Sequence, residues 1–172
     1  GEDKGISDIL KALPSAPRAI FVAVGGNDRD RERYEKEARD AGVTERVILR
    51  GSTTQRMLAL YQKAADVLLM PFPDTPHYRN HMSPVKMFEY MAGKRVIIAS
   101  DLPTIREVLS EENAVIIPAN DPEGLAKALQ VIASEPQRGV QLAERAYADV
   151  HTFSWSARTQ RILAWLGAEI SV

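Results

Sequence analysis

The chain of 172 residues contains no cysteine, so disulfides and thiolate metal sites are excluded. Its three histidines, His77, His81 and His151, are scattered without metal-ligand spacing. An excess of charge of one sign is also missing, because 22 Lys and Arg residues oppose 23 Asp and Glu residues, which gives a formal net charge of −1. This balance gives no reason to expect nucleic acid as a partner.

Long hydrophobic runs are missing too. No apolar stretch approaches the roughly 20 residues of a membrane span, and no signal peptide is recognisable. We therefore expect an intracellular, cytoplasmic protein, which leaves room for attachment at the periphery of a membrane. The chain begins at Gly1 rather than at a methionine, which is compatible with a piece of a longer protein.

What is present is a regular alternation of short apolar runs and helical segments, and 45% hydrophobic residues allow one domain with a sizeable core. Strands separated by helices predict right-handed βαβ units and a parallel sheet. The expected strands are Arg18–Val24, Arg46–Arg50, Asp66–Met70, Arg95–Ser100 and Asn113–Pro118. The expected helices are Ile6–Leu13, Asp28–Ala41, Thr54–Ala65, Thr104–Leu109, Asp121–Ser134, Pro136–His151 and Ser154–Leu166.

In such a sheet ligands bind at the carboxyl ends of the strands. Two strands end in glycine, at Gly25-Gly26 and at Gly51-Ser52, which would let the backbone approach a ligand closely. Glycines of tight turns that touch nothing are the alternative interpretation. The chain has no GxGxxG and no GxxxxGK[ST] motif, so simple dinucleotide-binding and ATPase functions lose support.

The segment NHMSPVKMFEYMAGKRVIIAS, from Asn80 to Ser100, is the most informative part of the chain. It predicts a loop, a helix with Ser83 as N-cap and Pro84 at the first helical position, a stop at Gly93 and a buried strand.

The first turn of this helix carries Lys86, a cation at the positive end of the helix dipole, which is unfavourable unless an anion binds. Free amides beside a cation predict a phosphate site, and Glu89 lies one turn deeper as an acceptor for a diol. The arrangement indicates a nucleotide ligand. The alternatives are a lysine that points into solvent and a surface carboxylate.

Taken together, these segments resemble the C-terminal half of a retaining glycosyltransferase of family 4, a group with the two-domain GT-B fold. The similar segments, in order, are KGISDILKAL at Lys4–Leu13, VAVGG at Val22–Gly26, ERVILRG at Glu45–Gly51, AADVLLMPFP at Ala64–Pro73, SPVKMFEYMAGKRVIIAS at Ser83–Ser100, LPTIREVL at Leu102–Leu109 and DPEGLAKAL at Asp121–Leu129.

The resemblance implies an α/β fold in which residues 1–172 form one Rossmann-like α/β/α domain with a parallel sheet. This lobe would hold a nucleotide-sugar donor, an absent N-terminal lobe of the same chain would hold the acceptor, and the terminal helix within residues 152–172 would contact that lobe. The family's first central strand precedes the Lys-Gly pair and has no counterpart here. Either neighbouring strands close the gap, or the missing strand belongs to a longer chain.

The resemblance also assigns roles to residues. Lys4 matches the basic residue that meets the donor phosphates, and Glu89 matches the acid that takes the ribose hydroxyls. The loop amides around Met82–Val85, a segment that includes Ser83 and Pro84, match those that hold phosphate and sugar. Backbone near Arg50, Gly51 and Ser52 would meet the base, and Gly25 lies at a neighbouring strand exit.

One position departs from the family. The first acid of its Glu–seven residues–Glu signature, which binds the transferred sugar, falls on His81. An imidazole can exchange one hydrogen bond with the sugar but, when neutral, brings no negative charge to an oxocarbenium-like transition state. Lys4 and His81 are therefore the candidate catalytic residues, and the sugar contact is the part of the site that changes.

The predicted reaction of the whole enzyme moves a hexose from a UDP- or GDP-sugar to a hydroxyl acceptor with retention, with no cofactor and no metal. The isolated domain is expected to be inactive, because the active site is a cleft between two lobes. Two alternatives stand beside this one. His81 and the missing lobe favour a non-catalytic module that binds a nucleotide or a partner protein. A nucleotide-sugar epimerase would need more acid and base side chains than this half offers.

Overall fold

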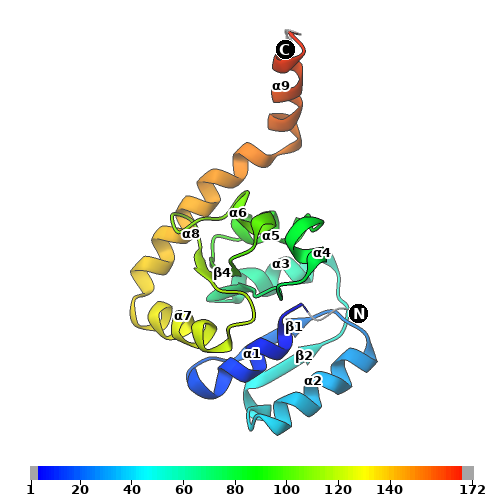
Figure 1. Cartoon of the computed structure of the whole chain (residues 1–172), viewed down its shortest axis with the longest axis vertical. Coiled ribbons are helices and arrows are strands. Elements are labelled where there is room, and N and C mark those ends of the chain that lie inside the picture. Colours follow the sequence, from blue (N-terminus) through cyan, green and yellow to red (C-terminus); the bar gives the residue numbers. More distant parts are fainter. Residues whose placement is uncertain (1–3, 168–172) are drawn as a thin grey trace.

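The computed structural model describes residues 4–167, and its five strands form two parallel sheets (Figure 1). In the first sheet β1 pairs with β2, with Phe21 opposite Val47. In the second, β4 lies between β3 and β5. The strands span Phe21–Val24 (β1), Val47–Arg50 (β2), Val67–Met70 (β3), Val96–Ser100 (β4) and Val115–Ile117 (β5). All five expected strands are confirmed, each shorter than its expected range.

The helices cover the two faces of these sheets. They are α1 (Ile6–Ala12), α2 (Asp28–Asp40), α3 (Gln55–Ala64), α4 (Pro76–Asn80), α5 (Val85–Ala92), α6 (Pro103–Arg106), α7 (Pro122–Ser134), α8 (Pro136–Val150) and α9 (Trp155–Trp165). Short 3₁₀ turns lie at Leu13–Ser15, Thr44–Arg46 and His151–Phe153. Side-chain caps explain several starts, since Asn27, Thr54, Asp121 and Ser154 each accept a hydrogen bond from an amide three residues on.

One helix was missed, and the start of another was predicted wrongly. Helix α4 was not expected, although Thr75 caps it by accepting from the Tyr78 amide and Pro76 occupies its first position. Helix α5 begins at Val85 rather than Pro84, because Pro84 adopts an extended conformation (φ −79°, ψ 95°) and becomes the N-cap. No side chain caps this helix, so Ser83 is not its N-cap.

Strand β4 is the centre of the core, with all five residues buried. Its alternate side chains face opposite layers, as the two-residue period of a strand requires. Ile97 and Ala99 join the cluster that includes Met87 and Met91 of α5. Ile98 joins the cluster with α1 and α7. Helices α5 and α8 thus cover one face of this sheet, and α1 and α7 cover the other, which confirms the α/β/α fold.

The expected sheet is interrupted between β1 and β3. Within residues 4–167 no strand hydrogen-bonds to both of them, so neighbouring strands do not close the gap. The two sheets are held together mainly by α1, which packs against α2 on one side and α7 on the other. Phe21 of β1 contacts the clusters of both halves. The β1–β2 unit is therefore attached by side-chain packing rather than by a strand ladder.

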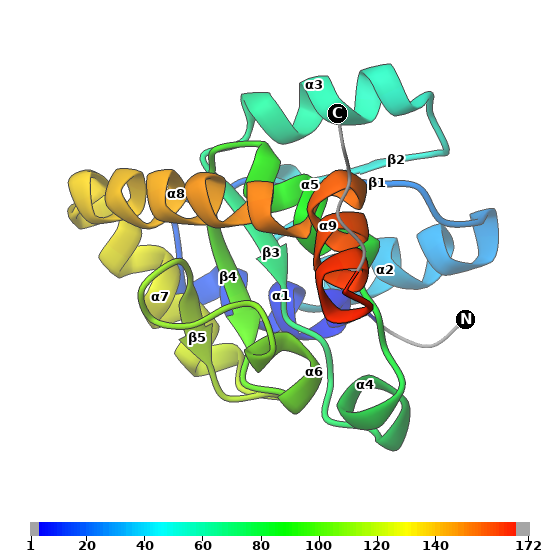
Figure 2. The ribbon, with the colours of Figure 1, turned by 90° about the horizontal axis from the view of Figure 1, so that it is seen from above.

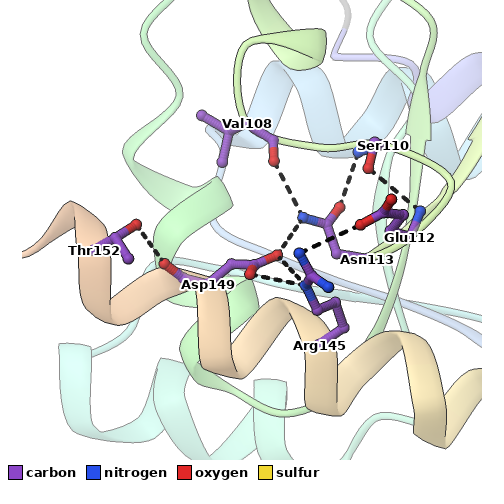
Figure 3. Close-up of polar contacts among 7 residues, drawn as sticks. All are labelled: Val108, Ser110, Glu112, Asn113, Arg145, Asp149 and Thr152. Carbon is purple, nitrogen blue, oxygen red and sulfur yellow. Dashed lines mark hydrogen bonds and ion pairs between the residues drawn. The ribbon is translucent and has the colours of Figure 1, made fainter.

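A buried polar network joins α8 to the loop before β5 (Figure 3). The Asn113 side chain is only 4% exposed, and its Nδ2 donates to the Val108 carbonyl (3.2 Å) and to Asp149 Oδ2 (2.9 Å). Its Oδ1 accepts from the Ser110 amide (2.9 Å), and Asp149 is held in turn by Arg145 Nε (2.9 Å). Both amide hydrogens and the amide oxygen thus have partners, and they tie α8 to the loop before β5.

Helix α9 extends away from the body of the domain (Figure 1), and in the view from above it is drawn over the body (Figure 2). Trp155 and Trp165, near its two ends, are 81% and 85% exposed. A contact between this segment and an N-terminal lobe stays a prediction, and its last five residues, 168–172, lie outside the described residues. Among the helices of residues 4–167, none combines the length and the apolar character that crossing a bilayer requires.

Candidate functional site

The start of α1, the end of β3 and the start of α5 meet at one carboxyl edge of the sheet. Gly5 brings the first two together, because its φ of +84° is left-handed and a Cβ on it would lie 1.7 Å from the Pro71 carbonyl oxygen. Only glycine fits this close approach. The Lys-Gly pair therefore places Lys4, which is exposed, beside the exit of β3.

Lys86 belongs to the same cluster. Its Nζ lies 4.4 Å from the ring centroid of Phe72, in the loop after β3, and 5.8 Å from that of Tyr90, one turn along α5. Phe72 is itself buried and stacked on Tyr78 at 4.8 Å between centroids. Burial, and secondly the positive charge of Lys4, lower the pKa of Lys86 to about 8. Because its ammonium group lies over these two rings, Lys86 does not simply point into solvent, as the alternative interpretation had it.

The first turn of α5 has unsatisfied donors. The Met87 amide bonds to the Pro84 carbonyl (2.9 Å), whereas the amides of Val85 and Lys86 have no acceptor among residues 4–167. Ser83 and Val85 are exposed beside them. Met82, by contrast, is half-buried and packs its side chain against the core. Uncapped amides at a helix N-terminus suit an anion.

Glu89 lies on the α3 side of α5. Its Oε2 accepts a long hydrogen bond from Gln62 Nε2 (3.4 Å), which leaves capacity for further donors. The half-buried carboxylate lines a groove of about 300 Å³ together with Gln55, Leu58, Ala59, Gln62, Lys63, Ala92 and Gly93. Burial and the charge of Glu89 raise the pKa of Tyr90. Glu89 therefore faces a groove and is not a free surface acid.

The exits of β1 and β2 form a second group of predicted residues. The Gly25 amide donates to the Arg50 carbonyl (3.0 Å), and Gly51 and Ser52 follow in an exposed loop. No atom lies within 4 Å of a Cβ built on Gly25 or Gly51, so this backbone is open to a ligand. No hydrogen bond or ion pair between described residues joins this group to Lys4 and Lys86. The link is α3, whose Gln55 lines the groove with Glu89.

His81 lies in the loop between α4 and α5. It follows α4, its amide donates to the His77 carbonyl (2.9 Å), and its exposed side chain makes no hydrogen bond, ion pair or ring contact with residues 4–167. Its role with the sugar stays a prediction. In the same range no group of three or more His, Cys, Asp and Glu side chains could hold a metal ion.

Sequence reasoning missed the groups that surround the predicted residues. The spacing of four between Lys86 and Tyr90 is a helical signal that could have indicated their contact. Nothing in the sequence indicated Phe72 or Gln62, which reach the site from other elements. Ser100, at the end of β4, was also missed. Its Oγ is buried and has no hydrogen-bond partner among the described residues.

Comparison with known proteins identifies the family. Residues 1–135 match the family described as glycosyl transferases group 1. A phosphatidyl-myo-inositol mannosyltransferase of Mycolicibacterium smegmatis is 29% identical over 93% of the chain and 40% of its own length. A D-inositol 3-phosphate glycosyltransferase of Thermomonospora curvata is 28% identical over 95% of the chain and 38% of its own length. The chain thus spans about two fifths of these relatives.

Solved structures agree with the fold. The sucrose-phosphate synthase of Thermosynechococcus elongatus superposes with a TM-score of 0.81, at 26% identity, over 95% of this chain and 42% of its own. Anabaena HepE, solved in complex with UDP, gives 0.78 at 16% identity, over 95% and 45%. The second likeness concerns the fold alone. From the family match over most of its length and from this fold, the chain belongs to the glycosyl transferases of group 1.

Proposed function

We propose that the chain is the donor-binding lobe of a retaining glycosyltransferase that moves a hexose from a UDP- or GDP-sugar to a hydroxyl acceptor. One observation carries the proposal. A cation at the start of α1, Lys4, and the uncapped amides of α5 lie at the same edge of the sheet, and Glu89 lies one turn further along α5 in the groove beside α3. A cation and free amides suit phosphates, and a carboxylate next to them suits a ribose diol.

Each part of the donor then has a partner. The diphosphate meets Lys4 and the amides of the Met82–Val85 loop, the ribose hydroxyls donate to Glu89, and the base lies against the backbone of Arg50–Ser52 near Gly25. HepE, which shares this fold, was solved with UDP bound, and this supports UDP as the first nucleotide to test.

Catalysis would consist mainly of positioning and of stabilising the charge that develops on the departing diphosphate. Lys4 and the loop amides supply that charge stabilisation, so no divalent metal and no cofactor is part of the proposal. His81 would offer one hydrogen bond to the transferred sugar. The acceptor would be held by an N-terminal lobe of the same protein, and this chain alone would not complete the reaction.

The test is a calorimetric titration of the chain with UDP, GDP and ADP, compared between the natural sequence and Glu89→Ala. We expect saturable binding of one nucleotide and a loss of tenfold or more in affinity in the variant, because a hydrogen bond to a charged acceptor contributes about 1.5–3 kcal/mol. Glu123→Ala is the matched control, since Glu123 is an exposed acid in the first turn of α7. Absence of binding by all three nucleotides would contradict the proposal.

A non-catalytic nucleotide- or partner-binding module is the second candidate, and His81 favours it because this position lacks the family's acid. The two candidate functions differ in whether sugar is transferred. A longer protein that contains this chain and an acceptor lobe should transfer sugar if the first proposal holds. Nucleotide binding without either transfer or hydrolysis of the nucleotide sugar would support the second.

A further inference from the structure

Lys86 is a partly buried cation whose charge no carboxylate meets within residues 4–167. The contacts of its Nζ are the rings of Phe72 and Tyr90. Lys94 is the comparison, because its charge is met by a carboxylate. Its Nζ also lies over a ring, that of Tyr147 at 4.3 Å, but it is 3.0 Å from Glu144 Oε2. A ring attracts a cation more weakly than a carboxylate does, so the Lys86 charge is incompletely compensated.

The charge that acts on Lys86 is that of another cation, Lys4. Lys4 reaches the same corner because Gly5 packs on Pro71, directly before Phe72. The amides of Val85 and Lys86 are open at the same helix end. The two ammonium groups repel each other, and the positive end of the helix dipole is unfavourable for both of them. An anion that lies between them would relieve both effects. The cluster is therefore built for a ligand with more than one negative charge.

We propose that Lys86 is a second phosphate-binding cation, which meets the diphosphate of the donor together with Lys4 while Phe72 and Tyr90 fix the position of its ammonium group. This inference rests on the proposed donor-binding function. Lys86 and Glu89 are three residues apart and so lie on adjacent sides of α5. One nucleotide can therefore place its phosphates on Lys86 and its ribose on Glu89.

The charge of Lys86 depends on pH near neutrality. The titratable groups around it are Lys4 at the start of α1, Tyr90 and Glu89 on α5, and Tyr78 of α4 behind the Phe72 ring. Burial and Lys4 lower the pKa of Lys86 to about 8, whereas burial and Glu89 raise that of Tyr90. Lys86 thus loses its charge between pH 7 and pH 9, and diphosphate binding should weaken about tenfold over this interval.

The experiment is a calorimetric titration of the chain with UDP and with inorganic pyrophosphate at pH 7 and pH 9. Lys86→Met should lose tenfold or more in affinity at pH 7 and show less than a twofold change to pH 9. Lys86→Arg keeps its charge at both pH values, so it should bind equally well at both. Lys94→Met is the matched control and should behave as the natural chain. Thermal unfolding verifies that each variant is folded.

The possible results separate this inference from the proposed function. Equal affinity of Lys86→Met and the natural chain for UDP would overturn the role of Lys86 and leave the donor site standing. Binding of pyrophosphate, lost in Lys86→Met, without binding of any nucleotide would support Lys86 and overturn the donor proposal. Failure of the natural chain to bind pyrophosphate at millimolar concentration would overturn the diphosphate site itself.

Discussion

Gly51 differs from most other loop glycines of this chain because the fold does not require it. Its backbone is outside the left-handed region, and a Cβ on it would meet no atom within 4 Å. Gly5, by contrast, cannot carry a side chain beside Pro71. For a glycine that the fold does not need, at a strand exit of a parallel sheet, we propose that it allows a ligand to approach the backbone closely.

This explanation gives a prediction for Gly51→Ala. The free energy of unfolding should change by no more than about 0.5 kcal/mol, since no contact or strain is introduced. Nucleotide affinity should fall about tenfold, because the added methyl group would lie where we propose that the base approaches. Urea unfolding and calorimetric titration measure the two effects.

Gly42→Ala provides the opposite control. Gly42 has a φ of +67° after α2, so alanine there should cost about 1 kcal/mol of stability without changing nucleotide affinity. Undiminished binding by Gly51→Ala would mean that Gly51 is an ordinary turn residue and that the base lies elsewhere.

At the scale of elements, the sequence predicts best where a local signal decides the outcome. Asp121 and Pro122 locate the start of α7, and the glycines after Val24 and Arg50 locate the ends of β1 and β2. The predicted start of α5 was wrong by one residue, because the fixed φ of a proline suits both the N-cap and the first helical position. Pro84 is the N-cap.

The candidate site was also predicted only where a local motif indicated it. Lys4 and Glu89 follow from the motif, and both lie where a ligand could reach them. The surroundings of Lys86 depend on Phe72, which comes from another element, and no spacing along the chain indicates such a contact. Residues that meet only through tertiary packing are the part that sequence reasoning cannot supply.

The Asn113 network makes a prediction about α8. Asn113→Ala removes two donated bonds and one accepted bond and leaves the half-buried Val108 carbonyl without this donor (Figure 3). We expect the free energy of unfolding to fall by about 2 kcal/mol. Thr152→Ala, which removes one exposed bond to the Asp149 carbonyl, should cost less than about 0.5 kcal/mol. Urea unfolding distinguishes the two, and equal costs would show that the network contributes nothing specific.

At the scale of the whole molecule, the interrupted sheet divides the domain into parts of unequal stability. Strand β4 is buried throughout and hydrogen-bonded on both sides. Strands β1 and β2 are exposed to half-buried, each with one partner, and α1 provides most of the packing that attaches them. Local opening costs less where burial and hydrogen bonding are sparse, so the β1–β2 unit should open while the rest stays folded.

Native-state hydrogen exchange can measure this difference. Amides of β1 and β2 should exchange through an opening that costs at least about 2 kcal/mol less than the opening of β4. Because the proposed nucleotide contacts include Arg50–Ser52 on one sheet and Lys4 and Glu89 beside the other, a bound nucleotide should join the two parts. Saturation with the nucleotide that binds should therefore raise protection in β1 and β2 more than in β4, and a nucleotide that does not bind should raise neither. Equal protection of β1 and β4 without ligand would mean that packing by α1 alone makes the domain a single cooperative unit.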